Sequence, residues 1–398
     1  MKIVVFAHRL DVGGTQVNAI ELTAALRDLH GHDVVIFATP GPMMKFAAEK
    51  GLRFLPAPEA TAHPSPARMR ALREVIRDER PDLIHVWDWP QCLDAYYGVY
   101  LLKRVPMVVT CMSMVLPRLL PKALPTTFGT PELLDHAAAS GRRHLKLILP
   151  PVDLKLNRPN AVDAQPFRNE YGINDDDVTL VTVSRLVDWM KVEGLRRTIH
   201  VVRTLGRELP LRFVIVGDGT SRGELERLAR ETNADLGRTA VVLTGELLDP
   251  RPAYAAASIV VGMGGSALRG MAFCKPVVII GERGFSAPFC PETADSFYYR
   301  GMYGLGDGNS SNARLIEDIR RLAGSREQAT ALGEFSRQFV LRHFSLQEVS
   351  AQLDEFCRAV AAADTPQRHV VVSDGLRTAA LVLGRNVVPG RLRRMFGR

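Results

Sequence analysis

The sequence predicts an α/β protein built from two domains, each with a doubly wound parallel sheet. The chain has 398 residues, whereas a single hydrophobic core rarely grows beyond about 250–300 residues. Short β-branched runs alternate with helical stretches, a pattern that is typical of parallel sheets covered by helices. This alternation stops at a polar, proline-containing stretch over residues 157–177 and then begins again. The carboxyl ends of parallel strands hold ligands, so we expect a ligand cleft between the two domains.

The first domain is expected to contain six buried strands with helices between them. Its strands are continuous apolar runs such as IVVFA, as expected where both faces of a sheet are covered. We predict strands over 2–7, 33–38, 52–55, 82–87, 106–111 and 145–149, and helices over 16–29, 66–78 and 131–140.

The second domain repeats the pattern and is followed by two long helices. Its predicted strands are 178–183, 211–216, 240–243, 258–261 and 276–280, and its closing helices are 325–343 and 345–363. We place the boundary near residues 155–170. The predicted organisation is therefore a first domain over 1–160, a second over 161–363, and a tail over 364–398.

Composition favours a cytoplasmic globular protein. With 46% hydrophobic and 24% charged residues, the chain has enough apolar material for two cores and is not disordered. Five cysteines, none in a C-x-x-C pattern, suggest neither a disulfide framework nor a zinc site. The N-terminus has only five apolar residues in a row, too few for the core of a signal peptide.

The positive charge is concentrated in the tail. Residues 366–398 hold seven arginines and one acid, Asp374, which accounts for +6 of the net charge of +8. Interleaved apolar residues would let the tail lie on an anionic membrane surface, and a solvated basic end is the alternative. Nucleic acid is not an expected partner, because no aromatic ladder accompanies the arginines.

Three segments that follow predicted strands are candidates for binding an anion. Gly13 and Gly14 lie at a turn between a strand and a helix, where backbone amides can approach a phosphate. Arg185 and Lys191 share one loop after the strand at 178–183, and two cations there can hold a diphosphate. Gly264-Gly265-Ser266 opens another helix after the strand at 258–261.

In this order and spacing, these segments resemble the retaining nucleotide-sugar glycosyltransferases of family 4, which have the GT-B fold of two Rossmann-like domains. The resemblance spans roughly residues 2–361. It rests on the glycine turn and on the stretches GHDVVIF, RPDLIHVW, ILPPVDL, VTVSRLVDWMKVEG, FVIVGDG and GMAFCKPVVI.

The resemblance implies transfer of a sugar from a nucleoside diphosphate to the hydroxyl of a glycan or lipid-linked acceptor, with no metal or other cofactor. Gly13 and Gly14 would contact the donor's phosphates, and Arg185 and Lys191 would hold the diphosphate. Gly265 and Ser266 would bind through backbone amides, and Leu247 would lie near the base. The implied location is the cytoplasm, peripherally at the inner membrane face, in cell-envelope polysaccharide synthesis.

The sequence departs from the family at two points. Two glutamates are expected, yet the second position holds Arg269 and Val261 stands eight residues earlier. Arg269 cannot accept hydrogen bonds from a ribose, although it can donate to a phosphate. A histidine often found after the strand at 106–111 is replaced by Cys111-Met112. A GT-B protein that binds nucleotide sugar or a partner subunit without turnover is therefore the alternative function.

Other motifs allow competing interpretations. The stretch from Gly217 to Gly223 resembles a dinucleotide-binding turn but follows the second strand of its domain, so a dehydrogenase is disfavoured; an epimerase is a further alternative. Asp175-Asp176-Asp177 precedes a strand and is interpreted as a polar turn. His30 and His32 are assigned to a turn. His8 and His85 lie at strand ends, where a buried histidine is favoured over a ligand contact.

Overall fold

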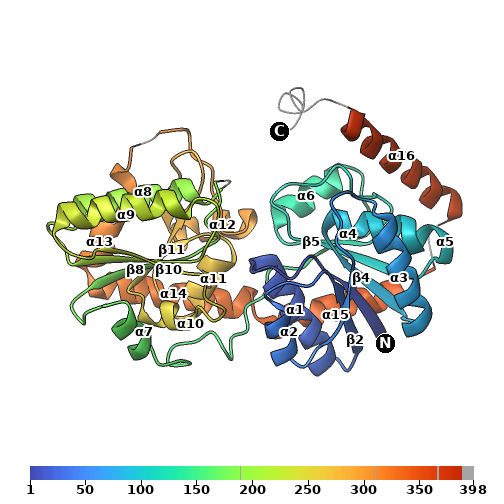
Figure 1. Cartoon of the computed structure of the whole chain (residues 1–398), viewed down its shortest axis with the longest axis horizontal. Helices are drawn as coiled ribbons and strands as arrows, with labels where there is room; N and C mark the ends of the chain where they lie inside the picture. Colours follow the sequence, from blue (N-terminus) through green and yellow to red (C-terminus); the bar gives the residue numbers. More distant parts are fainter. Residues whose placement is uncertain (189, 310, 365–366, 388–398) are drawn as a thin grey trace. The chain divides into compact units, whose positions relative to one another are not determined.

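The computed structural model describes residues 1–188, 190–309, 311–364 and 367–387. The chain forms two compact units, one of residues 1–150 with the chain from Gln347 onward, and one of Pro151–Leu346 (Figure 1). The predicted change of domain near residues 155–170 lies close to the first crossing between the units. The second crossing differs from the prediction. The helix expected at 345–363 was assigned to the second domain, but the chain from Gln347 onward belongs to unit 1.

Unit 1 contains a parallel sheet of seven strands in the order β3-β2-β1-β4-β5-β6-β7. This order reverses direction between β1 and β4, as in a doubly wound sheet. The short strand β6 was not predicted. The strands are β1 (Lys2–Phe6), β2 (Asp33–Ala38), β3 (Arg53–Pro56), β4 (Leu83–Trp87), β5 (Met107–Cys111), β6 (Thr126–Phe128) and β7 (Leu145–Leu147).

Helices cover the sheet of unit 1, and apolar strand residues form its core. Val4 and Phe6 of β1 and Ile84 and Val86 of β4 pack with Tyr96 in one buried cluster. The helices are α1 (Gly14–Asp28), α2 (Met44–Glu49), α3 (Pro66–Glu79), α4 (Asp88–Ala95), the π-helix η1 (Tyr96–Tyr100), α5 (Leu101–Lys103), α6 (Pro131–Ala139), α15 (Leu346–Ala362) and α16 (Arg368–Val387).

Unit 2 has a six-stranded sheet in the order β10-β9-β8-β11-β12-β13, parallel except for the edge strand β13. Its direction reverses between β8 and β11. The strands are β8 (Val178–Val183), β9 (Leu211–Val216), β10 (Val241–Gly245), β11 (Ile259–Gly262), β12 (Val277–Ile280) and β13 (Ser286–Pro288). The helices are α7 (Gln165–Glu170), α8 (Val192–Leu205), α9 (Arg222–Leu236), α10 (Arg251–Ala256), α11 (Gly265–Ala272), α12 (Pro291–Arg300), α13 (Ala313–Gly324) and α14 (Arg326–His343).

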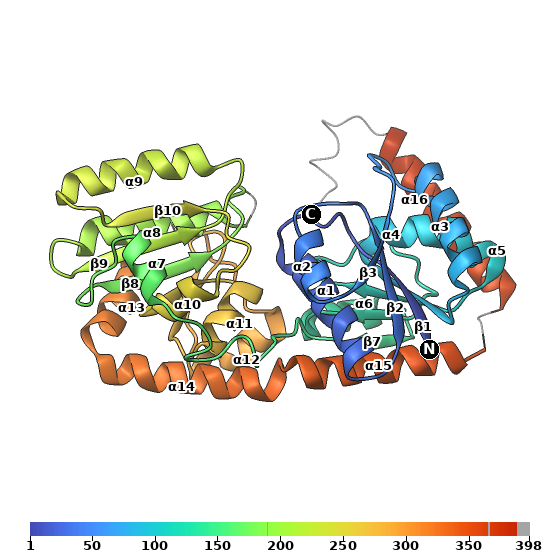
Figure 2. The ribbon, with the colours of Figure 1, turned by 60° about the horizontal axis from the view of Figure 1, so that its bottom comes forward.

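The helix α15 lies along unit 1 (Figure 2), and polar groups as well as buried apolar residues connect it to that unit. Asp354 of α15 accepts a hydrogen bond of 2.5 Å from His32 and lies 3.6 Å from His30. Arg358 donates to the carbonyl of His30. These two histidines therefore do more than form a turn, since they connect the start of β2 to a helix more than 300 residues later.

The predicted basic tail is a helix over most of its described length. In α16, Val371, Asp374 and Thr378 are buried, and Tyr96 and Tyr97 donate hydrogen bonds to α16 carbonyls. The interpretation of a fully solvated end is therefore wrong for this stretch. Residues 388–398, which hold four of the seven tail arginines, lie outside the described residues. No helix in the described part of the chain is long and apolar enough to span a membrane.

Candidate functional site

The candidate site of unit 2 lies where its sheet reverses direction. A small pocket opens at the carboxyl ends of β8 and β11, lined in part by Thr182, Ser184, Lys191, Gly262 and Met263. Such a reversal is where open α/β sheets bind ligands. The hydroxyl of Thr182 is buried, and no hydrogen-bond partner for it exists among the described residues. The lining of the pocket therefore contains a cation and a hydroxyl without a hydrogen-bond partner among the described residues.

The loop carrying Arg185 is held in place by two glycines of the GDG turn after β9. A side chain at Gly217 would put its Cβ 1.9 Å from the carbonyl oxygen of Ser184, and one at Gly219 would put it 2.4 Å from that of Leu186. Both glycines also have positive φ angles, 139° and 154°, which L-residues rarely adopt. These glycines thus have a packing role that explains their presence without a dinucleotide. Arg185 itself is exposed at this supported loop.

Lys191 is the predicted cation that reaches the pocket. It stands immediately before α8 and is half-buried. Burial, together with the charge of nearby Arg185, lowers the pKa of Lys191 from 10.5 to about 8. A lysine with this pKa is protonated at neutral pH at an energetic cost, which an anionic ligand would offset. Arg185 is therefore close enough for its charge to act on Lys191.

Helix ends add partial positive charge beside these cations. Neither α8 nor α11 has a side-chain cap among the described residues, and the first hydrogen bond of α11 runs from the amide of Leu268 to the carbonyl of Gly264. The amides of Gly265 and Ser266 therefore lie in the open first turn of α11. Gly264 allows this entry, since its φ of 55° is in the region that favours glycine.

Tyr254 supports the start of α11, and sequence reasoning missed it. Its ring is fully buried and stacks on Phe273, with centroids 5.9 Å apart. Its hydroxyl donates to the hydroxyl of Ser266 at 3.1 Å. This contact orients the Ser266 side chain, so that its hydroxyl proton and the backbone amide are the donors it can offer to a ligand. The sequence around Tyr254, AYAAAS, contains no motif that predicts this contact.

Glu193 is a second residue that sequence reasoning left without a role. Its carboxylate accepts hydrogen bonds from the amides of Arg283 and Gly284, at 2.9 and 2.6 Å. These bonds connect the first turn of α8 to the turn between β12 and β13. Since Lys191 lies two residues earlier, Glu193 holds the lysine's end of α8 to the sheet.

Arg269 and Leu247 lie outside the lining of the pocket. Arg269 folds back along α11, where its guanidinium donates to the carbonyl of Gly265 at 3.3 Å. That an arginine here replaces a glutamate of the family remains a prediction from the sequence. Leu247 is half-buried in the loop after β10, and β9 separates β10 from β8. The predicted contacts of these two residues with donor remain predictions.

The candidate glycines of unit 1 also begin a helix. Gly13 is the N-cap of α1, with extended backbone and no side-chain cap, and Gly14 is its first residue. A Cβ at Gly14 would meet no atom within 4 Å. The fold therefore does not require glycine at position 14 for space, which leaves room for a ligand at this helix end.

The strand-end histidines of unit 1 have different surroundings. His85 is buried and hydrogen-bonded to Thr110 at 2.7 Å, and burial lowers its pKa to about 3, so it is a neutral core histidine as expected. His8 is half-buried and lies 3.1 Å from the carboxylate of Asp88, a residue with a φ of 59°. The same aspartate also lies near Cys111, the residue at the end of β5. Burial, together with Asp88, raises the pKa of the Cys111 thiol well above its ordinary value.

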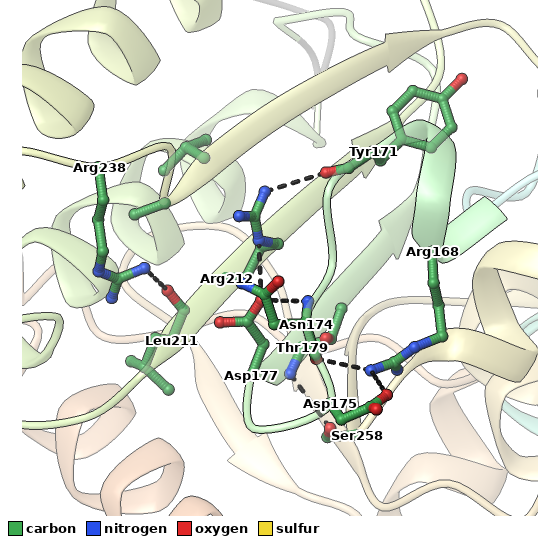
Figure 3. Close-up of polar contacts among 12 residues, drawn as sticks. Arg168, Tyr171, Asn174, Asp175, Asp177, Thr179, Leu211, Arg212, Arg238 and Ser258 are labelled. Atoms are coloured by element: carbon green, nitrogen blue, oxygen red, sulfur yellow. Dashed lines mark hydrogen bonds and ion pairs between the residues drawn. The ribbon is translucent and has the colours of Figure 1, made fainter. Parts of the chain in front are cut away.

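The acidic run at 175–177 is a polar turn, as predicted. Asp177 pairs with Arg212 at 3.2 Å and accepts from the amide of Asn174, while Asp175 pairs with Arg168 (Figure 3). The turn precedes β8 and so lies at the opposite end of this strand from Arg185. No group of three or more potential metal ligands exists among the described residues.

Two family descriptions match the chain, one in each half. Residues 12–144 match Glycosyltransferase Family 4, and residues 177–289 match Glycosyl transferases group 1. The chain is a member of the GT-B glycosyltransferases. These two segments include Gly13 and Gly14 in the first match and the other predicted site residues in the second. No curated protein matches the chain significantly in sequence.

Solved structures share this GT-B fold at low sequence identity. A glycosyltransferase from Rickettsia africae ESF-5 has a TM-score of 0.73 at 15% identity, covering 91% of this chain and 99% of its own. Anabaena Alr3699/HepE in complex with UDP and glucose has a TM-score of 0.70 at 15% identity, covering 90% and 100%. WaaG, a glycosyltransferase involved in lipopolysaccharide biosynthesis, has a TM-score of 0.62 at 14% identity, covering 89% and 99%.

Proposed function

We propose that this GT-B glycosyltransferase moves a sugar from a nucleoside-diphosphate sugar to an acceptor hydroxyl, with retention at the anomeric carbon. The observation that carries the proposal is the placing of Lys191, with Arg185 beside it, at the sheet reversal of unit 2. The UDP and glucose bound by the similar HepE structure support a sugar nucleotide as donor. Retention comes from the family resemblance.

The chain's own groups fit the charge that such a reaction develops. As the bond between the anomeric carbon and the β-phosphate oxygen breaks, the leaving diphosphate gains negative charge. Lys191, Arg185 and the first-turn amides of α11 are positioned in advance to stabilise that charge, which is the general way in which fixed donors lower such barriers. We accordingly propose that these groups, rather than a metal ion, neutralise the diphosphate. Without ligand, Lys191 carries this charge mainly below its pKa of about 8, and a bound diphosphate would favour the charged form further.

The acceptor is proposed to be a glycan or a lipid-linked cell-envelope precursor, reached at the cytoplasmic face of a membrane. The similarity to WaaG, which is involved in lipopolysaccharide biosynthesis, supports this acceptor class. The arginine-rich end of the chain supports a location at an anionic surface.

A second candidate function is binding of nucleotide sugar without turnover. Arg269 favours it, because a guanidinium folded onto the carbonyl of Gly265 stands where the family has a glutamate. An arginine cannot accept the hydrogen bonds of sugar or ribose hydroxyls.

Release or transfer of sugar from a panel of radiolabelled UDP- and GDP-sugars tests the proposal. We expect turnover of at least one donor in the presence of a membrane lipid extract, and a loss of about 100-fold in Lys191→Ala. Donor binding without turnover across the panel and extracts would instead establish the non-catalytic function. Turnover that is unchanged in both Lys191→Ala and Arg185→Ala would refute the assigned site.

A further inference from the structure

The helix α16 has an inner face that packs on unit 1. Val371, Asp374, Gly375 and Thr378, at positions i, i+3, i+4 and i+7, are buried. The only acid of the helix, Asp374, accepts a hydrogen bond from the amide of Ala123 at 2.8 Å and pairs with Arg377. The helix is therefore fixed in its rotation about its own axis, and its negative charge is directed inward.

A second apolar stripe on α16 has no such cover. Val372, Leu376, Ala379, Ala380 and Leu383 follow the spacing i, i+4, i+7, i+8, i+11, which places them on one face of a helix. Val372 is 42% exposed, Leu376 69% and Leu383 64%. The core of unit 1 does not account for this stripe, because a different set of α16 residues packs there. We call these five residues the outer stripe.

Neighbouring positive charge identifies the surface that the outer stripe fits. Arg368 at the start of α16 is exposed, and so are Leu102 and Lys103 of α5, the helix that contacts α16 (Figures 1 and 2). In sequence, four more arginines follow the helix with no acid among them. An exposed apolar face beside cationic side chains, on a helix whose single acid is buried, is typical of helices that lie in a membrane interface.

We propose that the outer stripe is a docking face for an anionic lipid bilayer, on which α16 lies parallel to the membrane plane. Leu376 and Leu383 enter the boundary between headgroups and acyl chains, and the arginines contact the lipid phosphates. A second copy of this chain is a poorer occupant, since two ends of charge +6 would repel one another. The inference deepens the membrane part of the proposed function by assigning residues to it.

Sedimentation of the full chain with vesicles tests this assignment. We expect binding to phosphatidylglycerol-containing vesicles, weaker binding to pure phosphatidylcholine vesicles, and weakening by salt. Leu376→Gln/Leu383→Gln should lower the partition coefficient by about 10-fold or more, because it removes two apolar side chains from the interface. Leu29→Gln/Leu305→Gln is the matched control, as both of these leucines are 50% exposed elsewhere, and it should bind like the unaltered chain.

Three results would overturn the proposal: no vesicle binding by the unaltered chain, equal binding by the outer-stripe variant, or self-association that this variant abolishes while vesicle binding persists. Melting temperatures of all variants establish that they are folded. The melting-temperature shift produced by UDP is measured separately on the same proteins. A failure of membrane docking is thereby distinguished from a failure of the donor site.

Discussion

Lys191 is the residue whose ionisation the account depends on most. Burial and the charge of Arg185 lower its pKa to about 8 in the absence of ligand. A rise in pH through this value removes the ammonium charge that a diphosphate would contact. The affinity for a nucleoside diphosphate should therefore fall as the pH rises from 7 through this pKa.

The corresponding measurement is the Kd of UDP at about pH 7 and about pH 9. Both values lie above the second pKa of a phosphate group, about 6, so the charge of the β-phosphate changes little between them. We expect affinity to weaken by about 10-fold with the loss of one charge-assisted contact. Lys191→Arg should retain affinity at the higher pH, and Lys191→Ala should bind weakly at both. An equal loss in the alanine variant would assign the pH dependence to another group.

A substitution at Gly14 can show whether glycine at this position serves ligand binding or the stability of the fold. Since a Cβ there meets nothing within 4 Å and the residue is the first of α1, Gly14→Ala should leave the melting temperature unchanged or slightly higher. If phosphate approaches this helix end, the same methyl group should weaken donor binding.

Gly223→Ala is the control for this experiment, because Gly223 also lies in the first turn of a helix, α9, with open space around it. Thermal denaturation and donor titration of both variants give the comparison. Lower stability of Gly14→Ala with unchanged donor binding would show that glycine serves the fold alone.

At the scale of elements, α15 is attached to unit 1 by a charged cluster. Burial raises the pKa of Asp354, but hydrogen bonds from Arg358 and His32 outweigh it and leave the pKa below 3.8. A carboxyl whose pKa is lowered by folding contributes stability above its unfolded pKa, and that stability is lost as pH falls through its folded pKa.

Asp354→Asn should therefore destabilise the protein at neutral pH by about 1–3 kcal/mol, since it removes the charge of a carboxylate that pairs with Arg358 and contacts His32. The difference from the unaltered chain should shrink below pH 3.8, the ordinary value for this carboxyl. Urea denaturation across this pH range measures it. A difference that is constant with pH would mean that packing, not charge, holds α15.

The elements that the sequence predicted well are those with a strong local signal. The continuous apolar strands around VTLVTV and LRFVIV were located within a residue or two, because burial on both faces of a sheet requires such runs. The three-residue strands β6 and β13 were missed, since so short a run carries no periodicity; the equally short β7 was found because it lies in a longer apolar run, LKLIL. The place of α15 was also missed, because the pairing of His32 with Asp354 joins residues 322 positions apart.

For the whole molecule, the order of motifs predicted more than any motif alone. The loop that carries Arg185 and Lys191 is far in sequence from the start of α11, and the strand order of unit 2 brings the two segments to neighbouring strand ends, as expected for parallel sheets. The supports of the site were not predictable in this way. Glu193 and Tyr254 act through contacts to residues 90 and 12 positions away, which no local pattern records.

The central claim, that these two cations hold a nucleoside diphosphate, is tested most directly by calorimetric titration with UDP and GDP. We predict that at least one nucleotide binds the unaltered chain and that Arg185→Ala/Lys191→Ala weakens it by about 100-fold or more, as two charged contacts are lost. Lys155→Ala/Arg207→Ala, which removes two exposed cations of the same unit, should bind normally. Equal affinity of the Arg185→Ala/Lys191→Ala variant and the unaltered chain would contradict the account.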